Sequence, residues 1–229
     1  MRNSLPVLLS IAAAGLAGCA ASAGSSYPAA TEASLATYAQ ATACCDDPSG
    51  FRFVPLPKQG HTDGVIDESS PVFDFQSGLS PFVAYELPAQ AVPYRVRVKS
   101  FFDPKGGDDA GVFYPVMALL DDAFIVVHIT GLESLRLEPA LATTGGEPGL
   151  AVSIGIDPAD RRGKYLVVFT PAALLGKPPP PDREGDMLSL ASLAWMERKG
   201  DAALPASPYG RIKVTIAPEV SVADGSRRD

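Results

Sequence analysis

The chain of 229 residues has few of the side chains on which most enzymes and metal sites depend. It contains only two histidines, three cysteines and one tryptophan. It also lacks a phosphate-binding loop, a dinucleotide-binding fingerprint, a Gly-x-Ser-x-Gly nucleophile motif and a His-Glu-x-x-His zinc motif, each of which marks a defined chemistry. We therefore expect a non-enzymatic protein with no cofactor and no metal ion.

Positive charge is also scarce, with 19 Lys and Arg against 26 Asp and Glu, for a formal net charge of −7. An acidic protein gains nothing from counterion release on a phosphate polymer, so we expect no nucleic-acid partner. Apolar residues make up 46% of the chain, which is typical of a globular protein. The 22 prolines and 21 glycines favour many short strands joined by turns over a helical fold.

The two histidines have ordinary structural interpretations. His128 lies in an apolar run, 124–129, where we expect a structural histidine, and His61 lies in a turn sequence, where we expect it to be solvated. The adjacent acidic pairs at 46–47, 108–109 and 121–122 are flanked by turn residues. They are expected to be solvated turn acids, although the sequence leaves open two carboxylates placed across a cleft.

The N-terminus has the pattern of an exported, lipid-anchored protein. Arg2 is followed by an apolar stretch, 5–17, that ends in Leu16-Ala17-Gly18-Cys19. The stretch is shorter than the ~20 residues needed to span a bilayer, which makes it a signal-peptide core. Leu-Ala-Gly-Cys matches the lipobox of bacterial lipoproteins, so we expect Cys19 to be lipidated. Ala20, where an Asp would typically retain the protein at the inner membrane, predicts the periplasmic face of the outer membrane.

Composition divides the chain into five segments. The segment over 19–33 consists mostly of small and polar residues, which is typical of a flexible linker. The final segment, 219–229, has no hydrophobic periodicity. The expected segments are a lipoprotein signal peptide (1–18), a flexible tether (19–33), an N-terminal β-sandwich half (34–130), a C-terminal β-rich half (131–218) and a disordered tail (219–229).

With Cys19 used for lipid, the adjacent pair Cys44 and Cys45 remains. In an oxidising compartment such a pair can form a vicinal disulfide. Adjacent Cα atoms lie ~3.8 Å apart across a trans peptide, closer than in ordinary disulfides. The alternative is two partly buried thiols at the end of a short helix over 34–45, and the sequence does not choose between the bridge and the thiols. Disulfide pairing between molecules is a third, less favoured alternative.

Strand patterns run through the rest of the chain and predict a mainly β protein with two antiparallel, β-sandwich-like halves and a few short helices. Tyr94, Val96 and Val98 alternate with basic residues, as in a strand buried on one face. Residues 165–169 are wholly apolar, and a helix is expected over 187–199. Antiparallel strands at this spacing favour a sandwich.

Several segments, taken in order, resemble the maltose operon periplasmic protein family (MalM-like). They are the Cys-Cys pair, Ser70–Gly78, Ser80–Pro88, Tyr94–Ser100, Val112–Pro115, Leu120–Phe124, Lys164–Thr170 and Tyr209–Val214. The resemblance implies a periplasmic accessory to maltose and maltodextrin uptake, with no catalytic or sugar-binding residues to carry over. It leaves open whether the chain binds an oligosaccharide or a porin or binding protein of the transport system. The alternatives are a general envelope scaffold for other proteins and, less favoured, a glycan-active enzyme.

We expect Cys19→Ser to move the protein from the membrane fraction to the soluble periplasm, because lipid alone would hold it at the membrane. Fractionation followed by a carbonate wash measures this. Retention of the Ser variant on washed membranes would contradict lipid anchoring.

Overall fold

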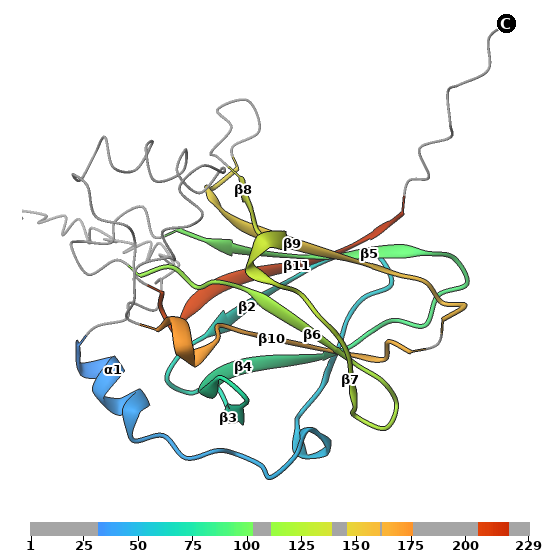
Figure 1. The fold of residues 1–229 in the computed structure, drawn as a ribbon. Coiled ribbons are helices and arrows are strands. Elements are labelled where there is room, and N and C mark those ends of the chain that lie inside the picture. Colours follow the sequence, from blue (N-terminus) through green and yellow to red (C-terminus); the bar gives the residue numbers. More distant parts are fainter. Residues whose placement is uncertain (1–31, 103–110, 139–145, 161, 176–205, 220–229) are drawn as a thin grey trace, which may run out of the picture.

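The fold is a sandwich of two β-sheets, seen edge-on in Figure 1. The computed structural model describes residues 32–102, 111–138, 146–160, 162–175 and 206–219. The expectation of a mainly β protein is confirmed. The lipobox Cys19, the tether, the acidic pair 108–109, the helix expected over 187–199 and the tail after residue 219 lie outside the described residues.

One sheet has six strands. Its order is β1-β4-β10-β6-β7, with β3 paired to β4, and only the β1–β4 pair is parallel. The strands are β1 (Val54–Pro55), β3 (Val72–Phe75), β4 (Gly78–Glu86), β6 (Val116–Leu120), β7 (Val126–Ile129) and β10 (Tyr165–Phe169).

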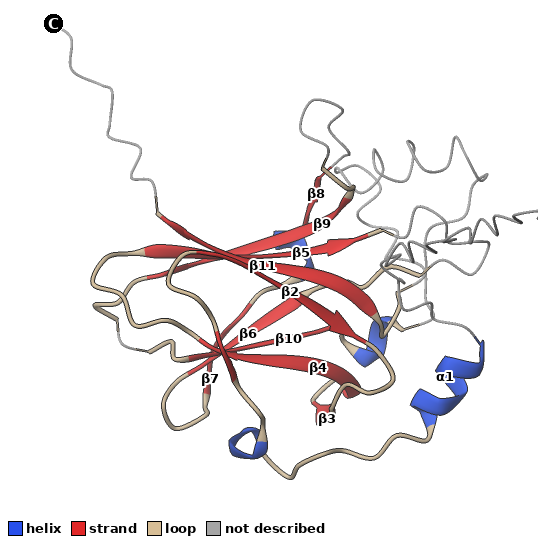
Figure 2. Ribbon diagram, turned by 180° about the vertical axis from the view of Figure 1, so that it is seen from behind, coloured by secondary structure: helices blue, strands red, loops and turns tan. Residues whose placement is uncertain are grey.

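The other sheet has five strands in the order β2-β11-β5-β9-β8, all antiparallel. Seen from behind in Figure 2, it forms the upper layer of the sandwich. The strands are β2 (Gly60–Ile66), β5 (Tyr94–Phe101), β8 (Arg136–Glu138), β9 (Gly149–Ile156) and β11 (Gly210–Pro218).

Helical structure is short throughout the described residues. It consists of α1 (Glu32–Ala39) and three 3-10 turns, η1 (Pro48–Gly50), η2 (Leu132–Ser134) and η3 (Ala172–Leu174). The Tyr38 hydroxyl on α1 donates a hydrogen bond to the Leu79 carbonyl of β4. The helix expected over 34–45 ends at Ala39, because the chain then runs to the sheet, where the Cys44 N–H donates to the Val72 carbonyl at 2.7 Å. In the described part of the chain, no helix has the length and apolarity that crossing a bilayer requires.

The two expected halves are interleaved in space. The five-stranded sheet takes β2 and β5 from 34–130 and β8, β9 and β11 from 131–218, while β10 lies between β4 and β6 in the other sheet. The position 130/131 is therefore not a boundary between sheets. Each half supplies strands that lack neighbours until the other half is present, so the described strands of both halves form a single sandwich.

The core between the sheets is mostly aliphatic, with a few buried tyrosine and phenylalanine rings. Val96 and Val98 of β5 are fully buried there, as are Leu166 and Val168 of β10. The alternation expected in β5 is confirmed, since its buried valines alternate with the more exposed Arg95, Arg97 and Lys99. Burial also raises the pKa of Tyr85 to about 12, so this phenol stays neutral in the core.

The two sheets differ in what covers their outer faces. On the outer face of the five-stranded sheet, Arg97 pairs with Glu138 of β8, and Lys99 Nζ lies 3.2 Å from the same carboxylate. The six-stranded sheet is instead apolar on its outer face as well, where Phe82, Val167 and Phe169 are buried. The wholly apolar sequence of β10 follows from this burial on both faces.

Val98→Asp is expected to destabilise the fold by several kcal/mol, because it places an ionisable group in a fully buried site. Denaturant unfolding measures the loss. Arg95→Gln is the matched control on the opposite face of β5, since it breaks only an exposed ion pair with Glu219 and should cost at most about 1 kcal/mol. Equal losses in the two variants would contradict burial on one face of β5.

Candidate functional site

The outer face of the six-stranded sheet carries a layer of packed aromatic rings. Phe51 lies over Phe82 with ring centroids 4.3 Å apart, and Phe75 stacks on Phe169 at 4.0 Å and 4°. Phe73 packs edge-on against Phe51 at 4.9 Å. These rings cover one region of the sheet and complete a second, smaller core.

Three further rings form the part of this layer that we call the aromatic platform, namely Phe53, Phe124 and Tyr165. All three are half-buried. Tyr165 lies 4.2 Å from Phe53 and 5.0 Å from Phe124, between ring centroids, and Phe124 is nearly parallel to it at 14°. Phe53 and Phe124 are 5.8 Å apart, which closes the triangle. The three rings therefore form one continuous aromatic cluster that still reaches solvent.

Phe124 has an unusual backbone conformation. Its φ of 62° makes it the one described non-glycine residue in the left-handed region, a conformation that is a genuine outlier for a bulky residue. The turn between β6 and β7 holds it there, because one carboxylate oxygen of Asp121 accepts the N–H groups of Ala123 and Ile125, each at 2.9 Å. Such strain persists only where the surroundings enforce it, and it concentrates at functional sites. Here it places the Phe124 ring on Tyr165.

Charged groups flank the platform. The Lys164 Nζ lies 5.1 Å from the Tyr165 ring centroid. A hydrogen bond with Tyr165 raises the pKa of Lys164, and the negative charges of Glu86 and Asp122 raise it further. The ammonium group therefore stays protonated beside the rings. The site combines an aromatic surface with a hydrogen-bond donor and two carboxylate acceptors nearby.

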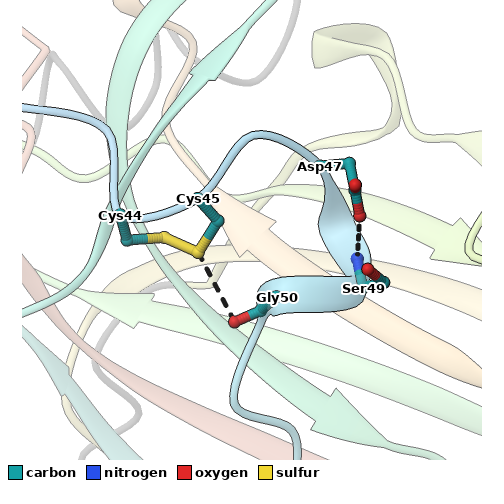
Figure 3. The surroundings of a disulfide bond; sticks show 5 residues. All are labelled: Cys44, Cys45, Asp47, Ser49 and Gly50. Carbon is teal, nitrogen blue, oxygen red and sulfur yellow. Dashed lines mark hydrogen bonds between the residues drawn. A yellow bond between two sulfur atoms is a disulfide. The ribbon is translucent and has the colours of Figure 1, made fainter.

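Cys44 and Cys45 are joined in a disulfide in the segment that enters this layer (Figure 3). The Cys45 side chain packs against the smaller core, and its Sγ lies 3.4 Å from the Gly50 carbonyl oxygen. A bridged sulfur carries no proton, so this approach is a close sulfur–oxygen contact. Next to it, the Asp47 carboxylate accepts the Ser49 N–H at 2.8 Å and caps η1.

The disulfide and the capped turn together position Phe51. A Cβ at Gly50 would lie 3.0 Å from the Cys45 Cβ, so the chain packs closely against the bridge at this point. Phe51 follows directly and contacts the rings of Phe53, Phe73 and Phe82. The vicinal pair therefore lies at the end of the aromatic layer.

A second feature is a cleft of about 260 Å³ between β7, the end of β9 and the turn that follows β9. Its aliphatic lining includes the buried Leu119 and Ile156, and its exposed polar lining includes His128, Asp160 and Arg162. The Arg162 guanidinium donates to Asp160 through Nε at 2.5 Å and Nη2 at 2.9 Å. These hydrogen bonds lower the pKa of Asp160.

The structure differs from the sequence-based interpretation of His128. It is exposed on β7, at the edge of its sheet, and lines the cleft; it is not a buried structural residue. An apolar run does not show whether a strand is central or at an edge, and β7 has a paired neighbour on one side only. His61 is exposed as expected, although it lies in β2 and not in a turn.

The described acidic pairs have turn roles. The carboxylate oxygens of Asp47 and Asp121 both accept hydrogen bonds from backbone N–H groups. Among the described residues, no three His, Cys, Asp or Glu side chains gather as a metal site would require. Sequence reasoning identified the strand that carries Tyr165 and the apolar run that begins at Phe124, but not the contact between the two rings. The pairing Tyr165↔Leu120 brings β10 beside the turn that holds Phe124.

Comparison of the chain with protein-family models, with curated proteins and with solved structures finds no match in any of the three. The functional argument therefore depends on the geometry of the platform and the cleft.

Protein purified from an oxidising compartment is expected to have a mass about 2 Da below the dithiol form, because bridging Cys44 and Cys45 removes two hydrogens. Replacing both residues by Ser should change global stability little, since adjacent residues close almost no loop in the unfolded chain. Intact-mass measurement and thiol labelling check the first point, and thermal unfolding the second. Two freely labelled thiols would contradict the bridge.

Phe124→Gly and Phe124→Ala separate the ring from the backbone. Both remove the ring, but only Ala keeps the ~1–2 kcal/mol cost of a left-handed L-residue. Gly loses ~0.5–1 kcal/mol through its freer unfolded chain, so we expect the Gly variant to be slightly the more stable of the two. Chemical denaturation measures the order, and a clearly more stable Ala variant would contradict the left-handed assignment.

Proposed function

We propose that this protein is a non-enzymatic, lipid-anchored accessory to maltodextrin uptake on the periplasmic face of the outer membrane, and that it binds oligosaccharide on the aromatic platform. The observation that carries the proposal is the position of Phe124, held in a strained conformation against Tyr165 and Phe53 where all three rings reach solvent. The lipobox at Cys19 and the family resemblance support the location and the substrate class.

The chemistry of the platform suits a glucose polymer. A pyranose ring has C–H groups on its faces and hydroxyls around its edge, so it can lie on aromatic rings while its edge bonds to polar groups. Ligand sites commonly combine an apolar surface with a few fixed polar groups in this way. At the platform, Tyr165 supplies the surface, and Lys164 supplies a charged donor beside it.

The charges favour binding over hydrolysis. A glycosidase needs a carboxylic acid whose pKa is raised, facing a second carboxylate across the scissile bond. At the cleft, the Arg162 guanidinium lowers the pKa of Asp160 instead. At the platform, the negative charges of Glu86 and Asp122 raise the pKa of Lys164.

A second candidate function is docking of a protein, such as a porin or a binding protein of the transport system. The exposed apolar residues at β7 favour it, since Ile125, Val126 and Ile129 are 62%, 53% and 55% exposed. A large exposed apolar patch often marks a protein interface. The same patch is what the alternative of a general envelope scaffold would require.

Titration of the Cys19→Ser protein with maltotriose and longer maltodextrins is expected to give measurable heat. Phe124→Leu should weaken binding about tenfold, since aromatic contacts contribute ~0.5–1.5 kcal/mol beyond their buried area. Val65→Ala is the control, because Val65 is an exposed apolar residue on the other sheet. Absence of heat with every maltodextrin would contradict sugar binding and favour the docking function.

A further inference from the structure

We propose that the cleft between β7 and the end of β9 is a second saccharide subsite, which takes the terminal ring of the oligosaccharide that lies on the aromatic platform. This inference rests on the proposed function and adds to it a defined end to the binding site. It is carried by the position, the chemistry and the size of the cleft.

The cleft and the platform lie at the same end of the six-stranded sheet. Leu119 lines the cleft on the inner side of this sheet, and the next residue, Leu120, packs on the outer side and pairs with Tyr165. Gly163 also lines the cleft and precedes Tyr165 by two residues, a chain distance of at most ~7 Å. Gly163 and Lys164, which precede β10, therefore separate the cleft on the inner side of the sheet from the platform on its outer face. A ligand of several rings that passes around this end of the sheet can contact both.

The polar groups of the cleft suit an uncharged ligand that needs donors and acceptors together. Asp160 and Arg162 hold each other in a neutral pair, and Asp157 and His128 add an acceptor and an imidazole. A phosphate or carboxylate ligand would meet two aspartates here. A hydroxylated ring can donate to the carboxylates and accept from the guanidinium, as each hydroxyl is both donor and acceptor.

The apolar part of the cleft suits the C–H face of such a ring. Leu119 and Ile156 are buried, and Val127 and Ile154 are half-buried beside them. The volume of about 260 Å³ is just below the range of sites that enclose drug-sized ligands. It fits one sugar ring rather than a chain, which is why we assign the cleft to the terminal ring.

The test uses the Cys19→Ser protein with glucose, maltose and a series of longer maltodextrins in calorimetry. Arg162→Gln and Asp160→Asn change exposed side chains of the cleft, so both variants should fold normally. Lys213→Gln is the matched control, because it breaks an exposed ion pair with Asp63 between β11 and β2, two strands that contribute no residue to the cleft. We expect each cleft variant to weaken maltotriose binding about tenfold and Lys213→Gln to leave it unchanged.

Amide NMR shifts of Gly155 and Gly163, which line the cleft, give an independent readout with glucose, galactose and phosphate. Shifts with glucose support the subsite, and shifts with phosphate alone would overturn it in favour of an anion site. If maltotriose binding depends on Phe124 but not on Arg162 or Asp160, the subsite is wrong and the proposed function stands. If maltodextrins give no heat while galactose shifts both glycines, the cleft remains a saccharide site and the maltodextrin function is wrong.

Discussion

Burial of the six-stranded sheet on both faces is the constraint on which the rest of the structure depends. A sheet that is apolar on both sides must be covered twice, and the five-stranded sheet covers only one side. The aromatic layer covers the other, and part of it comes from the segment that carries the disulfide and η1. Phe51 is the most deeply buried ring that this segment contributes. The cover is thus part of the fold, although this part of it comes from a stretch with almost no regular secondary structure.

The same constraint explains why the candidate site lies where it does. The cover is densest over Phe82 and Phe169, where Phe51, Phe73 and Phe75 pack. Toward the end of the sheet at which β10 begins, the rings become half-buried and the neighbours become charged. A ligand that stacks on this end would complete the cover of the sheet. Binding and folding would then draw on the same apolar surface.

Sequence patterns predicted the strands whose burial depends on their own residues. The alternation of β5 predicted its one buried face, and the wholly apolar run at 165–169 marked the strand β10, which the structure buries on both faces. Patterns could not predict pairings between distant segments, such as β2 with β11, or the edge position of β7 that exposes His128. They also left the state of Cys44 and Cys45 open, because spacing alone does not show what the sulfurs contact. The platform escaped prediction for the same reason, since Phe53, Phe124 and Tyr165 come from three separate segments.

The position of β11 has a consequence for how the chain reaches its fold. β11, the last of the described strands in the sequence, lies between β2 and β5, and it pairs Ile216 with Gly60 at one side and with Val96 at the other. A chain that emerges from its N-terminus onward cannot close this sheet until its final described residues have emerged, and such distant pairings fold slowly. In the interval β2 has no neighbour in its sheet. Its sequence, GHTDGVI, is polar and contains two glycines. Before β11 pairs with it, β2 is therefore a poor template for pairing with the strands of other chains.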